Sequence, residues 1–208
     1  MFIQRSTVRN LVLSVKRGIE DDKHAMLWLA AYLFLLRVPS EALPMRRGGG
    51  EYVPAASEQS VISLVDSNTV CLRLHRRKNK LGGSVLRRTC ACAACPEVCP
   101  VHKLWHGYFE KLMPGEQPWG DISPDRARAH LRASLAALRV PDHACYGTHD
   151  FRRGHAKDLQ QSGAPLATVL AAGEWKSRAV KQYLDLGELE CDLALEAAMN
   201  SDDDEWID

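Results

Sequence analysis

The sequence has few aromatic residues and no long apolar run, and both shortages limit what the chain can be. Aromatic side chains make up 7% of its 208 residues. The longest strongly apolar stretch, Ala25 to Leu36, has 12 residues and ends at Arg37, whereas a spanning helix needs about 20. No N-terminal signal peptide is recognisable. With 46% hydrophobic and 25% charged residues, we expect one soluble intracellular domain with a real core and no membrane partner.

Acidic residues are missing from one stretch of an otherwise balanced chain. The formal net charge is +1, but residues 73–88 carry seven Lys or Arg and no Asp or Glu. The acidic C-terminal tail, residues 201–208, holds five of the 26 acids. The rest therefore has 27 basic and 21 acidic residues, a net charge of +6. Such a basic run suits a polyanion, and the alternative is a solvated basic hairpin.

The spacing of apolar residues predicts a mainly α fold with a small antiparallel three-stranded β-sheet. Two helices are expected between Ser6 and Leu36, with a break near residues 18–22. Strands are expected around residues 61–65, 70–74 and 83–89, and residues 46–56 are expected to form a loop. Further helices are expected over the ranges 101–113, 124–138, 148–161, 165–172, 177–185 and 188–199.

Cysteine is unevenly spread. Four of the seven, Cys90, Cys92, Cys95 and Cys99, lie within ten residues, and His102 follows them. An odd, clustered set does not suit a secreted disulfide framework. Zinc binds four ligands in a tetrahedron, which favours a structural zinc on Cys90, Cys92, Cys99 and His102. The alternative is a set of reduced thiols that pack the loop beneath the next helix.

Several polar residues stand out by their type and order. His149 and Arg152 are three positions apart on an expected helix, so they share a face. Arg37 follows the early apolar helix in the run Leu36-Arg37-Val38-Pro39-Ser40-Glu41. Trp175 stands two residues after a glycine, and Tyr183 follows it by eight residues. Each of these signals is weak alone.

In this order they resemble the catalytic domain of tyrosine recombinases, the family of phage integrases and Cre-type enzymes. The resemblance covers residues 1–200 and implies that family's DNA breaking-rejoining fold. The Gly-x-Trp spacing and the Cys-rich segment are most similar to the fungal crypton-type branch. The implied catalytic residues are Arg37, Lys78, His149, Arg152, Trp175 and Tyr183. Glu41 matches the family's acidic partner and is expected to orient Arg37.

The resemblance implies a metal-independent reaction with no cofactor for catalysis. Arg37 and Arg152 would hold the non-bridging oxygens of a phosphodiester. Tyr183 would attack the phosphorus, and Lys78, or Lys80 as a competitor, would protonate the leaving 5′ oxygen. The product would be a 3′-phosphotyrosine link, as in the integration of a mobile element.

The implied partner is double-stranded DNA, with self-association on it and a nuclear location. Contacts to DNA are expected from the following residues: Arg73, Arg76, Arg77, Lys80, Arg87, Arg88, Arg153 and Lys176. The N-terminal core-binding domain usual in the family is expected to be absent from this chain, so DNA binding should be weak and strongly salt-dependent. The segment 188–199 has an apolar side that would dock on a neighbouring protomer or on its own domain.

Two other hypotheses about the function stay open. One is a catalytically silent, recombinase-derived module that binds DNA or another partner without turnover. The other is a zinc-dependent interaction module centred on the Cys/His loop, with the acidic tail as a protein-binding end.

Overall fold

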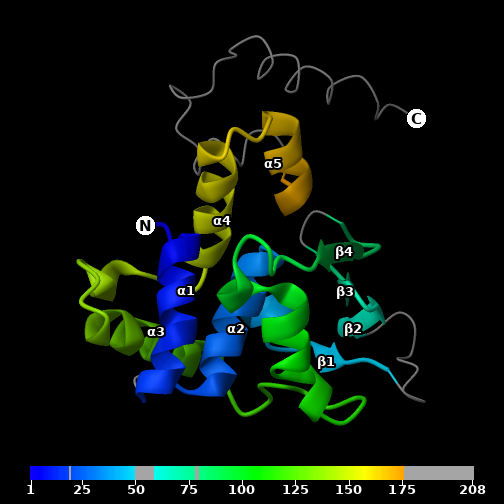
Figure 1. Ribbon diagram of the computed structural model, residues 1–208, viewed down its shortest axis with the longest axis horizontal. Coiled ribbons are helices and arrows are strands. Elements are labelled where there is room, and N and C mark those ends of the chain that lie inside the picture. Colours follow the sequence, from blue (N-terminus) through cyan, green and yellow to red (C-terminus); the bar gives the residue numbers. More distant parts are fainter. Residues whose placement is uncertain (19, 50–58, 78–79, 176–208) are drawn as a thin grey trace.

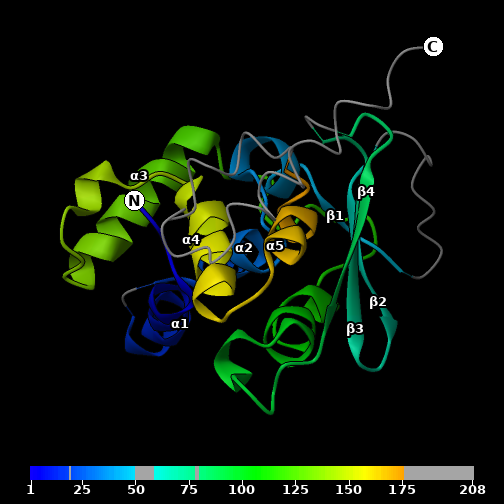
Figure 2. The ribbon, with the colours of Figure 1, turned by 90° about the horizontal axis from the view of Figure 1, so that it is seen from above.

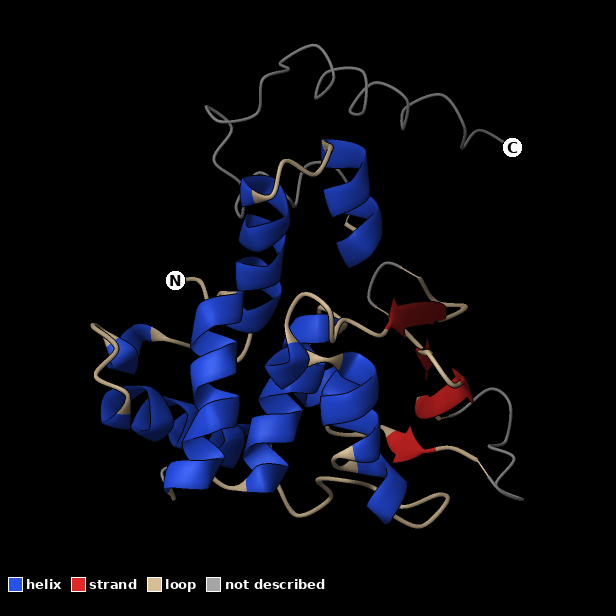
Figure 3. Ribbon diagram, in the orientation of Figure 1, coloured by secondary structure: helices blue, strands red, loops and turns tan. Residues whose placement is uncertain are grey.

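A computed structural model of the chain describes residues 1–18, 20–49, 59–77 and 80–175 (Figure 1). About half of the molecule is helical, and a small sheet lies at one side of the helices, as Figure 3 shows. The five α-helices of the described residues are α1 Arg5–Ser14, α2 Asp22–Leu33, α3 Pro124–Ala137, α4 Asp150–Gln161 and α5 Leu166–Gly173. The short helical turns are Val15–Arg17, Val38–Ala42, Pro96–Val98, Pro100–His106, Phe109–Lys111 and His143–Cys145. No described helix is both long enough and apolar enough to cross a membrane.

Helix α2 is the central helix of the core. The side chain of Asp21 caps its first turn by accepting a hydrogen bond from the backbone N–H of His24, at 2.8 Å. Residues 25–33 are all buried, so the helix is apolar all round, as expected for an element surrounded by others. Trp28 is fully buried and stacks on Phe151 of α4, with ring centroids 5.3 Å apart. This contact fixes α4 against α2.

The end of α2 differs from the expected one. The apolar run continues to Leu36, but the helix ends at Leu33 because Leu35 has a left-handed backbone with φ of 50°. A γ-branched residue adopts this region at a cost of about 1–2 kcal/mol. The turn directs the carbonyl of Leu35 toward two arginines of the candidate site, and the chain then enters the turn Val38–Ala42.

The sheet corrects the expected strand count and topology. Its strands are β1 Arg46–Arg47, β2 Val61–Asp66, β3 Thr69–Leu74 and β4 Ser84–Thr89, in the order β1-β2-β3-β4. The three expected strands are present and antiparallel. The added β1 pairs parallel to β2, so the sheet is four-stranded and mixed. Two arginines give no alternating apolar pattern, which is why a loop was expected there.

The view from above separates the sheet from α4 and α5, which lie beside α2 (Figure 2). One face of the sheet packs on the helices through Ile62, Leu72 and Leu86, which lie side by side in register. The expected single helix over 101–113 is instead two short turns, because the backbone of Tyr108 leaves the helical region between them.

Helix α4 also packs against the N-terminal segment. A Cβ at Gly154 would lie 1.9 Å from the carbonyl oxygen of Ile3, so only glycine permits this approach. The backbone N–H of Ile3 donates to the carbonyl of Asp150 at 2.9 Å. A second, smaller core joins α4, α5 and the end of α2 through Leu35, Ala156, Leu166, Val169 and Trp175. These contacts place the first turn of α4 beside the end of α5.

Candidate functional site

Two arginines from distant parts of the chain bind one buried carboxylate, that of Glu41. Arg37 donates to Glu41 Oε1 at 2.8 Å from its side chain and to Oε2 at 2.9 Å from its backbone. Arg77, at the end of the β3 segment, donates to the same carboxylate from Nε and Nη2, at 3.2 Å each. Burial favours the neutral acid, but the hydrogen bonds and charges of Arg77 and Arg37 outweigh it and lower the pKa of Glu41. Glu41 therefore orients Arg37, as expected, and also Arg77.

Arg152 joins this group through the backbone of Leu35. It lies on α4, is 1% exposed, and donates from Nη1 to the carbonyl of Leu35 and from Nη2 to that of Gly173. Arg77 Nη2 donates to the same Leu35 carbonyl at 3.0 Å. We call Arg37, Arg77 and Arg152, with Glu41, the arginine cluster.

Trp175 covers the guanidinium of Arg152. The ring centroid lies 4.6 Å from Arg152 Cζ, which is a cation–π contact, and the tryptophan is buried. A Cβ at Gly173 would lie 2.2 Å from the indole ring, so glycine at this position lets the ring fold back over the helix end. The indole of Trp175, rather than the carboxylate of Glu174, therefore faces Arg152.

His149 precedes α4 and lies among the positive charges. Its pKa is lowered to about 4, first because the ring is partly buried and then because Arg152, Arg153 and Arg37 repel an added proton. The imidazole is therefore neutral at pH 7. Arg153 is half-buried and makes an ion pair with Asp150 at 3.3 Å. Four expected catalytic residues, Arg37, His149, Arg152 and Trp175, thus occupy one region, while Lys78 and Tyr183 lie outside the described residues.

The basic run of residues 73–88 is divided between two environments. Arg73, Arg76 and Arg87 are exposed. Arg77 is 3% exposed, and its guanidinium donates hydrogen bonds to Glu41, Glu174 and the Leu35 carbonyl. Arg88 packs over the ring of Phe34 and donates to the carbonyl of Leu33 at 2.6 Å. Arg77 and Arg88, both expected to contact DNA, therefore make their observed contacts within the chain, and Lys176 lies outside the described residues.

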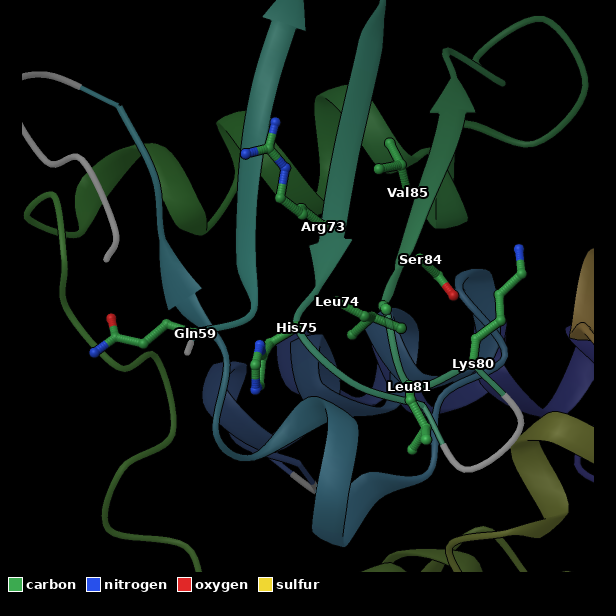
Figure 4. A pocket seen from close by; sticks show the side chains of 10 residues that line it. Gln59, Arg73, Leu74, His75, Lys80, Leu81, Ser84 and Val85 are labelled. Carbon is green, nitrogen blue, oxygen red and sulfur yellow. The ribbon is translucent and has the colours of Figure 1, made fainter. Parts of the chain in front are cut away.

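Arg73 also lines a cavity of about 470 Å³ beside the β3–β4 connection (Figure 4). His75 and Lys80 line the same cavity, and Gln59 lies at its far side. Lys80 forms an ion pair with Glu174 at 2.9 Å. The cavity carries positive charge on an open surface, which suits contact with an anion.

The Cys-rich loop brings together the four expected metal ligands. The ligand atoms of Cys90, Cys92, Cys99 and His102 all lie within 4.8 Å of one another. Cys90 Sγ lies 3.6 Å from Cys99 Sγ, and His102 Nδ1 lies 3.1–3.7 Å from the three sulfurs. A tetrahedral zinc with ordinary bond lengths places two sulfurs about 3.8 Å apart and a sulfur and a nitrogen about 3.5 Å apart. We call these residues the Cys3His centre, and its donor set fits zinc.

Backbone groups support the same centre. The N–H groups of Ala91 and His102 both donate to Cys99 Sγ at 3.4 Å. Burial opposes ionisation of this thiol, but the two hydrogen bonds outweigh it and bring its pKa to about 6. Cys95, the fifth candidate in the sequence, lies instead beside Glu97, with Sγ 3.5 Å from Oε2. Geometry thus separates Cys95 from the other three thiols.

A second group of titratable residues was not expected from the sequence. Glu20, Asp21, His24 and His130 bring their polar atoms within 4.8 Å of one another. The two imidazole rings stack, with centroids 3.6 Å apart and an interplanar angle of 10°. Imidazole binds a metal in the plane of its ring, and two parallel stacked planes do not meet at one ion. This arrangement suits hydrogen bonding to the carboxylates rather than a metal.

Glu174 is the functional candidate that sequence reasoning missed. It ends α5 and contacts Arg77, Lys80 and Ser84, all from the β3–β4 hairpin. No motif marks it, because its partners are about 90 residues away in the chain.

Comparison with known proteins does not assign a family or a function to the chain. No protein-family model matches it, and no curated protein is significantly similar to it.

Proposed function

We propose that this chain is a DNA strand-cleaving and rejoining domain of the tyrosine recombinase type. The observation that carries the proposal is the meeting of Arg37, His149, Arg152 and Trp175, which the chain separates by up to 138 positions. Buried arginines clustered around a neutral histidine favour binding of a phosphodiester. Residues 201–208 form an acidic tail beyond the proposed domain.

The proposed reaction needs each of these groups in a distinct role. Arg37 and Arg152 stabilise the charge that develops on the non-bridging oxygens. The phenol of Tyr183 has an ordinary pKa of about 10, so it must lose its proton as it attacks, and neutral His149 is the base in this scheme. The new phenol oxygen–phosphorus bond replaces the bond to the 5′ oxygen, which takes a proton from Lys78. Because the 3′-phosphotyrosine link keeps the energy of the broken bond, rejoining needs no ATP.

The biological setting follows from the resemblance alone. It is the integration of a mobile element of the crypton type in the nucleus, with several copies of the chain assembled on double-stranded DNA. The exposed Arg73, Arg76 and Arg87 supply phosphate contacts in this scheme.

A structural zinc in the Cys3His centre completes the proposal. The centre lies between the end of β4 and the turn Pro100–His106, on the loop that packs against α1. A zinc there would brace the base of the β3–β4 hairpin and take no part in strand cleavage.

The test is a nicked suicide substrate, from which the cleaved 5′ fragment diffuses away and leaves the protein trapped on DNA. We expect a covalent adduct with the natural chain and none with Tyr183→Phe, whose affinity for the same DNA should be unchanged. An adduct of equal yield with Tyr183→Phe would show that the nucleophile is misassigned.

A second function is favoured by the burial of Arg152. Its guanidinium is 1% exposed and holds the carbonyls of Leu35 and Gly173, so its observed role is to join α2, α4 and α5. A recombinase-derived module that binds DNA without turnover is consistent with this. It would bind the suicide substrate with a strong salt dependence and form no adduct at any protein concentration.

A further inference from the structure

Glu174 is held in a backbone conformation that its residue type disfavours. Its φ is 50°, in the left-handed region, at the position after α5 where glycine is the usual residue. A non-glycine residue there carries strain, and such strain persists where surrounding contacts over-determine it. The contacts of its side chain therefore need an explanation beyond ending a helix.

Within the part of the chain that the structure describes, the three side-chain contacts of this carboxylate come from one hairpin. Oε2 accepts from Arg77 Nη1 at 2.9 Å and from the hydroxyl of Ser84, and Oε1 accepts from Lys80 Nζ at 2.9 Å. The side chain is 15% exposed. These hydrogen bonds outweigh partial burial and lower the pKa of Glu174 to about 2, so the carboxylate is ionised at neutral pH.

The contact between Glu174 and the β3–β4 hairpin joins two parts of the proposed site. Arg77 and Lys80 are closed against each other by backbone hydrogen bonds of 3.0 and 3.1 Å. They flank Lys78, the proposed proton donor, in the chain. On the other side, Trp175 follows Glu174 directly and covers Arg152.

We propose that Glu174 is a positioning residue that latches the β3–β4 hairpin to the end of α5, and so fixes Arg77 and Lys80, the two described residues that flank Lys78 in the chain. The catalytic part of this inference rests on the proposed function, whereas the latch itself does not. A carboxylate next to Trp175 would repel a phosphate if it faced Arg37 and Arg152, the two arginines proposed to bind the phosphate. Bound to Arg77, Lys80 and Ser84, its charge is neutralised on the hairpin side.

The latch is tested first without reference to activity, by limited trypsin digestion. The hairpin contains trypsin sites at Arg76, Arg77, Lys78 and Lys80. Glu174→Gln keeps the size of the side chain and removes its charge, so we expect cleavage within residues 76–80 to become about tenfold faster. Glu110→Gln, at an exposed glutamate paired with His106, is the matched control and should not change the cleavage rate. Equal cleavage of Glu174→Gln and the natural chain would overturn the latch.

The positioning role is tested next, by separating rate from affinity on the suicide substrate. In Glu174→Gln we expect single-turnover adduct formation to fall about tenfold while the dissociation constant for DNA changes less than about twofold. An unchanged adduct rate in a variant with faster hairpin cleavage would overturn the positioning role. If the natural chain forms no adduct, the proposed function fails, and the trypsin result alone decides the latch.

A second variant, on the hairpin side of the contact with Glu174, tests the latch even if Glu174→Gln misfolds. Ser84→Ala removes one of the three donors and leaves the charges in place. It should increase hairpin cleavage in the same direction as Glu174→Gln, by about threefold, with the melting temperature within a few degrees of the natural chain. No increase in this folded variant would count against the latch.

Discussion

The arginine cluster and the Cys3His centre differ both in burial and in the groups that face one another: Glu41, Arg77 and Arg152 are buried, whereas in the Cys3His centre only Cys99 is buried and His102 is exposed. In the arginine cluster each guanidinium is matched by groups of the chain itself, chiefly Glu41 and two backbone carbonyls. In the Cys3His centre three thiols and one imidazole, all groups that ligate zinc, face one another within 4.8 Å. In the first region a carboxylate of the chain offsets part of the positive charge, whereas the donor set of the second fits one cation.

If the Cys3His centre holds zinc as proposed, the two regions obtain their stability from different sources. Removal of a side chain should damage the arginine cluster, because it leaves buried groups unmatched. Removal of the metal should damage the Cys3His centre, because metal binding is then part of the folding free energy. The following experiments test this contrast in order of decreasing expected effect.

The largest effect is expected for zinc. We expect about one zinc per chain by mass spectrometry and, on Cys92→Ser, a loss of metal with a loss of at least about 3 kcal/mol of stability. For a domain of this size that is a fall of about 6–12 °C in melting temperature. Cys95→Ser, in the same loop but outside the centre, should keep both the metal and the melting temperature. Equal zinc content in both variants would contradict the assignment of the Cys3His centre as the zinc site.

Arg152→Met is expected to have the next largest effect. It removes the donors to the Leu35 and Gly173 carbonyls and the partner of Trp175, so we expect a loss of about 3 kcal/mol of stability in urea denaturation. Arg37→Met is the comparison, because the Arg37 side chain is 25% exposed, and it should cost about 1 kcal/mol. Both should abolish the adduct. Equal stability losses would contradict the central position given to Arg152.

A smaller effect is expected from pH. Burial and the nearby arginines hold the pKa of His149 at about 4 in the folded chain, against an ordinary 6.5. Between these values the unfolded chain takes up a proton that the folded chain does not, so stability falls as pH falls from about 6.5 to about 4. His149→Gln should flatten this loss by about 1 kcal/mol, given the partial solvation of the ring. His155, whose pKa is also lowered to about 4, would account for the loss that remains.

The smallest effect on stability is expected on the outer surface. Arg73 and Arg87 are exposed, so Arg73→Gln and Arg87→Gln should each change stability by less than about 0.5 kcal/mol. If they contact phosphates, each should reduce the salt slope of DNA binding by about one. Arg77→Gln should instead destabilise the fold, because it leaves Glu41 buried with one charged partner fewer. A salt slope unchanged by both outer variants would place the DNA elsewhere.

The sequence predicted the Cys3His centre well because its ligands lie within thirteen residues. Local spacing limits which side chains can meet, and the structure separates Cys95 from the other three thiols as the sequence predicted. The three longer strands and the five α-helices of the described residues were predicted for the same reason, since each depends on a local period of apolar residues. The helices expected over 177–185 and 188–199 lie outside the described residues. Strand β1 was missed because two arginines show no period and its pairing with β2 is set by the rest of the fold.

The burial of Arg77 could not be predicted, because it depends on contacts across 36 and 97 positions. A run of seven basic residues looks uniformly exposed until the strand register assigns each residue a face. Arg73 then points outward, and Arg77 reaches Glu41. Glu174 was missed in the sequence because its hairpin partners Lys80 and Ser84 lie 94 and 90 positions away and give no local signal. The meeting of Arg37 with His149 and Arg152 was expected from family resemblance, since no physical rule about spacing connects them.

The most direct test of the central claim is to find which residue becomes attached to DNA, and through which end. The trapped adduct would be digested with nuclease and protease and its peptides sequenced by mass spectrometry. The account predicts a nucleotide linked through its 3′ phosphate to Tyr183. A link to any other residue, or through a 5′ phosphate, would contradict it.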